Sequence, residues 1–147
     1  MHRFHWLERL EHDGQSLVLH LAELLRGEPD GLVGSPLEVM PESPRFRVHF
    51  ADVGAFKTLP EMFNEVSESA SKIGPFLFQE ASSPYMLEMK DAMELSRNIP
   101  MGILQHYIVY AENAVTHVLA ASPPEFSEGS SNGPNNSSKP TPLRGAA

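Results

Sequence analysis

The chain contains no cysteine. This absence excludes a disulfide framework, a thiolate nucleophile and any zinc or iron–sulfur site held by cysteine. Long hydrophobic runs are also missing: the longest ones, such as Leu17 to Leu21, are broken by polar residues, whereas a helix that crosses a bilayer needs roughly 20 apolar residues. The N-terminal residues form neither the apolar segment nor the small-residue cleavage site of a secretory signal. We therefore expect a cytoplasmic protein with no membrane association.

Positive charge is scarce in this chain. Lysine and arginine number 11 against 19 aspartates and glutamates, and the formal net charge at pH 7 is −8. Because the acids and bases after Ser122 cancel, this net charge belongs to the first 122 residues. Such a charge repels nucleic-acid phosphates and anionic lipids, and it attracts basic proteins. We therefore expect no nucleic-acid partner and a basic protein as the partner that the charge favours.

Large apolar residues are nearly absent from Pro123 onward. Of the last 25 residues, 16 are Pro, Ser, Gly or Asn, and only Phe126 and Leu143 are large and apolar. A segment of this composition buries too little apolar surface to offset the entropy cost of ordering it. The composition therefore predicts one domain over residues 1–122 and a disordered tail over residues 123–147.

Two segments have the strict alternation of half-buried β-strands. Within residues 8–21, the pair Asp13-Gly14 favours the positive φ of a tight turn, so we expect a β-hairpin there. The strand after the turn is expected to bury Leu17, Leu19 and Leu21. Residues 45–50 alternate in the same way and are expected to bury Phe46, Val48 and Phe50.

The pattern changes after residue 50. Asp52 and Gly54 interrupt the alternation, which indicates a bend that leads into a continuing strand. Further along, apolar residues at spacings of three, four and three predict a helical face formed by Phe63, Val66, Ala70 and Ile73.

The second half of the chain predicts short elements. Residues 76–80 indicate a strand with Phe76 and Phe78 inward, and Ser83 can cap a short helix that begins at Pro84. Residues 104–121 indicate a long strand with a break near residues 112–113. The fold class that results is α+β: mainly an antiparallel β-sheet or open β-sandwich, with one or two short helices.

Three segments carry a resemblance to a family of small uncharacterised bacterial proteins. They are FADVGAFK at 50–57, LFQEASSPY at 77–85, and the stretch from HYIVY to SPPEF at 106–126. The family pattern is an F-x-D-V-x-A-[FY]-[KR] strand, a Ser-x-Tyr helix start and an H-Y-x-[IV]-Y closing strand. The resemblance implies a shared architecture and contains no catalytic signature. It also implies that the chain is a candidate immunity protein or toxin-system accessory.

No motif in the chain specifies a reaction. The pair His2-x-x-His5 lacks the acidic residue of an HExxH zinc site, and there is neither a Gly-x-Ser-x-Gly elbow nor a phosphate-binding glycine loop. We therefore predict no catalytic residue, no metal site and no cofactor. His106 is interpreted as a hydrogen-bonded histidine of the sheet, with a general base as the alternative.

The favoured hypothesis is a non-catalytic protein-binding module, of the immunity or toxin-accessory kind, that engages a basic protein. Rim charges steer such an encounter, and the candidates are Glu11, Glu61, Glu65, Glu68 and Glu88. A competing hypothesis is an enzyme or small-molecule binder whose pocket gathers His49, His106, Tyr107 and Tyr110. A third is a homo-oligomeric structural protein, which an open sheet edge would favour.

Overall fold

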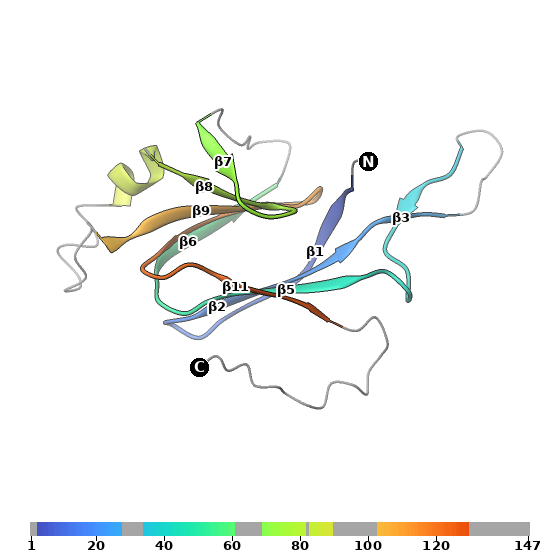
Figure 1. The fold of residues 1–147 in the computed structure, drawn as a ribbon, viewed down its shortest axis with the longest axis horizontal. Helices are drawn as coiled ribbons and strands as arrows, with labels where there is room; N and C mark the ends of the chain where they lie inside the picture. Colours follow the sequence, from blue (N-terminus) through green and yellow to red (C-terminus); the bar gives the residue numbers. More distant parts are fainter. Residues whose placement is uncertain (1–2, 28–33, 61–68, 82, 90–102, 130–147) are drawn as a thin grey trace.

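The computed structural model describes residues 3–27, 34–60, 69–81, 83–89 and 103–129. In this part of the chain, two antiparallel sheets lie face to face as a β-sandwich (Figure 1). The first sheet has the strand order β1 (His5–His12), β2 (Leu17–Glu23), β5 (Arg45–Phe50) and β11 (Glu125–Gly129). The second has the order β6 (Val53–Leu59), β10 (Val115–Ala120), β9 (Gln105–Tyr110), β8 (Leu77–Glu80) and β7 (Ala70–Lys72).

Two smaller elements complete the described fold. Strands β3 (Leu25–Arg26) and β4 (Leu37–Glu38) form a two-stranded ribbon, and residues 84–89 form a short helix. The predicted antiparallel β-sheet is confirmed. The α+β description is too helical for the described residues, because one short helix forms no layer of its own. None of the helical residues described belongs to a helix with the length and apolar character needed to span a membrane.

The β1–β2 hairpin forms where it was predicted. Gly14 has a φ of 96°, a conformation that costs glycine little, and the Asp13 carboxylate accepts hydrogen bonds from the backbone N–H groups of Gln15 (3.0 Å) and Ser16 (2.8 Å). The bonds from Ser16 and Gln15 lower the pKa of Asp13 to about 2. The turn is therefore held by local contacts that the Asp-Gly pair supplies.

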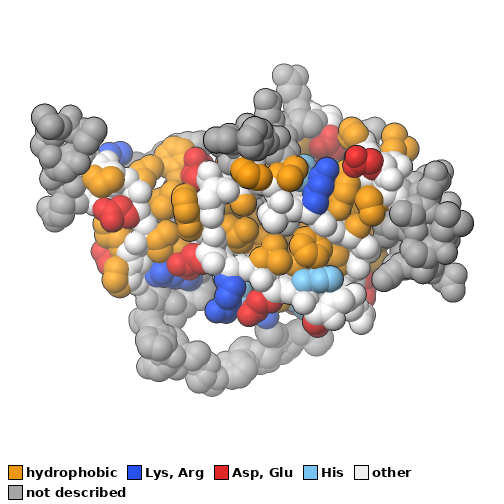
Figure 2. All heavy atoms as spheres, turned by 180° about the vertical axis from the view of Figure 1, so that it is seen from behind, with side chains coloured by type: hydrophobic (Ala, Val, Ile, Leu, Met, Phe, Trp, Pro, Cys, Tyr) orange, Lys and Arg blue, Asp and Glu red, His pale blue; other side chains and the backbone are white. Residues whose placement is uncertain are grey.

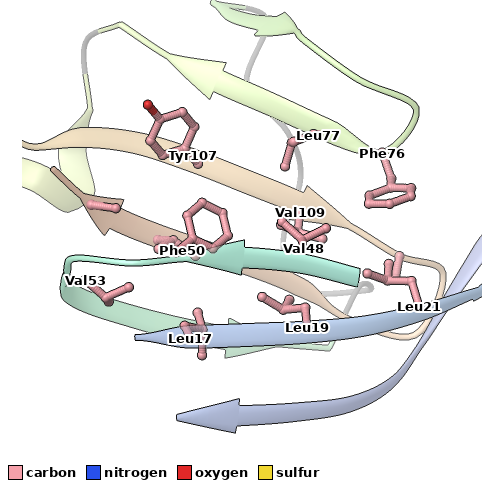
Figure 3. Packing of buried hydrophobic residues seen from close by; sticks show 13 residues of the cluster. Leu17, Leu19, Leu21, Val48, Phe50, Val53, Phe76, Leu77, Tyr107 and Val109 are labelled. Carbon is pink, nitrogen blue, oxygen red and sulfur yellow. The ribbon is translucent and has the colours of Figure 1, made fainter. Parts of the chain in front are cut away.

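The hydrophobic core lies between the two sheets. Leu17, Leu19 and Leu21 of β2 are fully buried, as predicted, together with Val48 and Phe50 of β5. They meet apolar side chains of the second sheet, among them those drawn in Figure 3: Val53, Phe76, Leu77, Tyr107 and Val109. Alternation on both sheets thus builds one shared core.

The chain changes sheets at Asp52. The predicted bend is present, but β5 and β6 belong to different sheets and do not form one continuing strand. The Asp52 backbone carbonyl accepts a bond from the Ala121 N–H (2.9 Å), and its carboxylate accepts bonds from the side chains of Gln15 (3.4 Å) and Ser122 (3.3 Å). These contacts connect three loops at one end of the sandwich.

The tip of the β9–β10 hairpin connects the second sheet to the edge of the first. The predicted long strand is in fact this hairpin, whose turn includes a bond from the Ala111 N–H to the Ala114 carbonyl (2.9 Å). The Asn113 side chain accepts from the Leu7 N–H (2.8 Å) and donates to the Leu7 carbonyl (3.0 Å). The amide thereby satisfies the backbone of β1 as a neighbouring strand would.

Two predictions in the middle of the chain are wrong for the described residues. Residues 70–72 form β7, which pairs with β8, so the predicted helical face does not extend to Ala70 and Ile73. Its beginning, at residues 61–68, lies outside the described residues. In β8 the inward side chain is Leu77, because Phe76 fills the core from the preceding turn and Phe78 faces the other side.

The predicted domain boundary at residue 122 is too early. Residues 125–129 form β11, which pairs along the whole length of β5 except Phe50. The composition of this segment is polar, but backbone pairing with β5 and the stacking of Phe126 on Phe46 (ring centroids 5.7 Å apart) anchor it. Residues 130–147 of the predicted tail lie outside the described residues.

Candidate functional site

The outer face of the five-stranded sheet carries a group of buried polar side chains. The strand registers place Leu119, His106 and Glu80 side by side in one row, and Lys57, His117 and Ile108 in the next. The short helix at 84–89 contributes Tyr85, whose ring lies edge-on to His106 (5.7 Å) and His117 (6.1 Å). His106 is 2% exposed and His117 is 8% exposed, so water scarcely reaches either ring.

Three side chains form a hydrogen-bonded series, which we call the His–His–Ser network. The Ser83 Oγ atom lies 2.6 Å from His106 Nδ1, and His106 Nε2 lies 2.9 Å from His117 Nδ1. When both neutral rings carry their hydrogen on the same kind of nitrogen, either Nδ1 or Nε2 in both, one hydrogen lies between the imidazoles and the bond forms. If both rings are protonated, an N–H group faces another N–H group and this bond is lost. The network is therefore built for a pair that carries at most one charge.

Burial disfavours that charge. Desolvation lowers the pKa of His117 from 6.5 to about 4, and repulsion from His106 and Lys57 adds to the effect. Desolvation also lowers the pKa of His106, although the Glu80 carboxylate partly opposes this shift. The buried Glu80 side chain accepts a bond from the Ser69 hydroxyl (2.7 Å). At neutral pH both imidazoles are therefore uncharged.

Ser83 connects the network to the helix. Its hydroxyl oxygen accepts a bond from the Met86 N–H (2.9 Å), and its backbone carbonyl accepts one from the Leu87 N–H (3.2 Å). This is the predicted N-cap, with Pro84 at the first helical position. Tyr85 packs below the helix, as do Met86 and Met89, while Leu87 is 74% exposed. One serine thus caps the helix and bonds the histidine that the helix covers.

The network has the residue types of a nucleophilic site but not its accessibility. A serine nucleophile needs an adjacent base and a place for the substrate. Ser83 is 8% exposed, its oxygen already accepts the capping bond, and it lines neither of the clefts described below. The prediction of a hydrogen-bonded sheet histidine at His106 is confirmed. No group of three or more metal-ligating side chains occurs among the residues that the structure describes.

An open cleft of about 600 Å³ lies beside the network, between the tip of the β1–β2 hairpin, strand β6 and the short helix. Its lining includes all five residues of 53–57. Successive side chains of a strand point to opposite faces, so five consecutive residues line one cleft only when it runs along the edge of the strand. Because β6 is the outermost strand of its sheet among the described residues, the cleft follows an edge that no other described strand covers, although the Val53 N–H at its start donates to the Gln15 carbonyl (2.9 Å). We call it the β6 cleft.

The walls of the β6 cleft combine aromatic and charged groups. The Lys57 ammonium lies 4.5 Å from the centre of the Tyr85 ring and 3.9 Å from the Glu88 carboxylate. On the opposite wall, His12 makes an edge-on contact with Phe56 (4.8 Å). Burial and the neighbouring Glu88 raise the pKa of Tyr85 to about 12, so its hydroxyl stays protonated. From the back of the molecule, apolar side chains are seen to gather across the middle of the surface, with charged side chains around them (Figure 2).

The structure does not bring together the predicted His/Tyr pocket. His49 lies on β5 of the other sheet, where it is 3.5 Å from Glu125. His106 and Tyr107 are neighbours on β9 and point to opposite faces, so Tyr107 packs against Phe50 in the core. Tyr110 lies at the far end of β9. Strand alternation therefore separates residues that lie close together in sequence.

The structure also does not bring together the glutamates predicted as rim charges. Glu11 lies on the first sheet, where it pairs with Arg9 (3.3 Å) and His20 (3.1 Å). Glu88 lies on the helix and lines the β6 cleft. Glu61, Glu65 and Glu68 lie outside the described residues.

His117 is the member of the network that sequence reasoning missed. The available signal was a strand-like segment at residues 115–119, which follows the strand that contains His106. This pattern brings His117 close to His106 only if the two strands form a hairpin. Comparison of the chain with protein-family models, with curated proteins and with solved structures gave no match.

Proposed function

We propose that the protein is a non-catalytic binding module that recognises a basic protein through the β6 cleft. The observation that carries the proposal is the position of the cleft along an open sheet edge. An extended segment of a partner can add to such an edge as a further strand, because the outward N–H groups of the edge strand can donate backbone hydrogen bonds and its outward C=O groups can accept them. The side chains on either wall then select the partner.

The cleft offers such a segment both apolar and ionic contacts. Phe56, Tyr85 and Met89 supply apolar surface, and an aromatic side chain in a cleft is a frequent anchor of protein interfaces. Glu88 is 63% exposed in its side chain and lies at 3.9 Å from Lys57, a distance at which the pair is weak and its carboxylate stays available. The net charge of −8 steers a basic partner toward the molecule.

Charge reversal at Glu88 tests this proposal. We expect Glu88→Lys to reduce recovery of the partner in a pull-down at moderate salt. Glu38→Lys is the matched control, since it makes the same charge change on the exposed strand β4, which does not line the cleft. Equal recovery with both variants, or no protein recovered by the unaltered chain, would contradict the proposal.

Hydrogen exchange tests the mode of binding. A strand added to β6 slows amide exchange at residues 53–59, whereas contact through the outer face of β1, β2, β5 and β11 leaves these amides unchanged. A toxin encoded nearby is the first partner to test, as the resemblance to immunity proteins suggests. Rescue of growth by the unaltered chain, and weaker rescue by Glu88→Lys, is the expected result.

A second copy of the chain is the alternative occupant of the β6 edge. Two β6 strands pairing across a two-fold axis would form a continuous sheet, which is a common route to a homo-oligomer. Light scattering distinguishes the two functions: a monomer at micromolar concentration favours the basic partner, and a dimer that Ala55→Pro converts to a monomer favours self-association.

A further inference from the structure

A row of basic side chains crosses the outer face of the four-stranded sheet, in an otherwise acidic protein. The strand registers pair Arg9 with His20 and His20 with Arg47, so that three neighbouring strands contribute to one row. These side chains line a second cleft, of about 390 Å³. Its lining contains three arginines and one glutamate, whereas the whole chain carries a net charge of −8.

Internal contacts compensate two of the three arginines. Arg45 forms an ion pair with Glu8 (3.2 Å) and donates to three backbone carbonyls at 2.9 to 3.2 Å, those of Met40, Pro41 and Ser43. Arg9 lies 3.3 Å from the Glu11 carboxylate and 3.3 Å from His20 Nε2. The Arg45 guanidinium therefore stabilises the adjoining loop and has little capacity left for a ligand.

Arg47 is the arginine of this cleft without a direct partner among the described residues, although, together with the hydrogen bond from His20, its charge helps to lower the pKa of the nearby Glu11 carboxyl. It lies half-buried at the centre of the row, between β2 and β11, and its side chain makes no hydrogen bond or ion pair within the described part of the chain. A guanidinium presents five N–H donors in a planar fork that matches the two oxygens of a carboxylate or phosphate. A half-buried guanidinium that makes no direct hydrogen bond retains its N–H donors for such a group.

We propose that this cleft is a binding site for a small oxyanion, a ligand that bears a phosphate or carboxylate group. Arg47 forms the charge-assisted hydrogen bonds, and Arg9 and His20 bound the site on the β1 side. The Glu11 carboxylate, which is bonded to both Arg9 and His20, orients these two side chains. The site lies on a different sheet from the β6 cleft, so it goes beyond the proposed function and does not depend on it.

Titration with inorganic phosphate and with acetate, followed by NMR amide shifts at low ionic strength, tests the site. We expect saturable shifts on β2, β5 and β11, and about ten-fold weaker binding in Arg47→Ala, the loss of one strong charge-assisted bond. Arg47→Lys is expected to weaken binding to a smaller extent, because it keeps the charge and loses the fork.

Lys72→Ala is the control for net charge. It removes one positive charge from the exposed strand β7 of the other sheet and is expected to leave binding unchanged. If Arg47→Ala fails to fold, the proposal is tested by comparing anion binding by Arg47→Lys with anion binding by Lys72→Ala. The absence of a saturable shift with either anion, or equal weakening by the Lys72 and Arg47 variants, would overturn the proposal.

Discussion

The two faces of strands β9 and β10 differ sharply although they are made by alternate residues of the same segments. On the inner face, Tyr107, Val109 and Val118 are buried in an apolar core. At the margin of this core His5 packs against Phe46 and Phe76, and burial lowers the pKa of His5. On the outer face, His106 and His117 are also buried but polar. The inner face is stabilised by apolar contact, which does not depend on pH. The outer face is stabilised by hydrogen bonds that require neutral rings.

The largest expected effect concerns the inner face. Phe50→Ala removes a fully buried ring that packs against Tyr107 and leaves a cavity between the sheets. We expect the free energy of unfolding to fall by about 3–5 kcal/mol, by a similar amount at pH 7 and pH 5. Urea denaturation at both pH values measures this. A loss that depended strongly on pH would show that the two faces are not independent.

Acidification is expected to act on the outer face. Because the pKa of His117 falls from 6.5 to about 4 on folding, the unfolded chain binds a proton first as the pH drops. The contribution of neutral His117 to the free energy of unfolding is therefore fully present above pH 6.5. It decreases as the pH falls toward 4, by about 3 kcal/mol in total for this shift of pKa. The lowered pKa values of His106 and His5 act in the same direction.

The variant His117→Asn sharpens this prediction. Its side-chain oxygen can accept the hydrogen bond from His106, but the residue no longer titrates. We expect a flatter dependence of unfolding free energy on pH between 6.5 and 4 than in the unaltered chain, with a remaining slope from His5 and His106. Phe50→Leu, on the inner face, is the control and is expected to retain the full slope. An unchanged slope in His117→Asn would refute the assignment.

Ser83→Ala is expected to have a smaller effect, because it removes one hydroxyl that serves both the helix and the network. The Met86 N–H loses its cap and His106 Nδ1 loses its partner, so the free energy of unfolding should fall by about 1–2 kcal/mol. Faster amide exchange at residues 86 and 87 would accompany the loss. Ser83→Thr keeps the hydroxyl and should restore protection; if it does not, the hydroxyl is not the cause.

The smallest effect is expected at the exposed rim of the outer face. Glu88→Gln removes the carboxylate of a pair whose side chains are 63% and 39% exposed, so the free energy of unfolding should change by less than about 0.5 kcal/mol. Thermal denaturation at low and high salt measures this. A larger effect would mean that the Lys57–Glu88 pair is part of the stabilising network and not a surface contact.

Local patterns predicted the elements whose causes are local. The hairpin turn depends on Asp13 and Gly14, which lie beside each other in sequence, and the Ser83 cap depends on the backbone N–H group of Met86, three residues further on. The buried face of β5 follows from its alternation. Contacts between distant segments were not predictable in this way. Strand β11 forms in a polar segment because β5 offers it a free edge, and residues 70–72 pair with β8 although their spacing is also compatible with a helix.

The sequence by itself determined a cysteine-free, acidic chain of alternating strands with a tight hairpin and a capped short helix, since each of these follows from composition or from neighbouring residues. The tertiary structure alone decided which strands share a sheet and hence which polar side chains meet. His106 and His117 are eleven residues apart and bond only because β9 and β10 are antiparallel neighbours, and Arg9, His20 and Arg47 form a row only through the registers of three strands. Strand register depends on long-range packing of the core, which no short segment encodes.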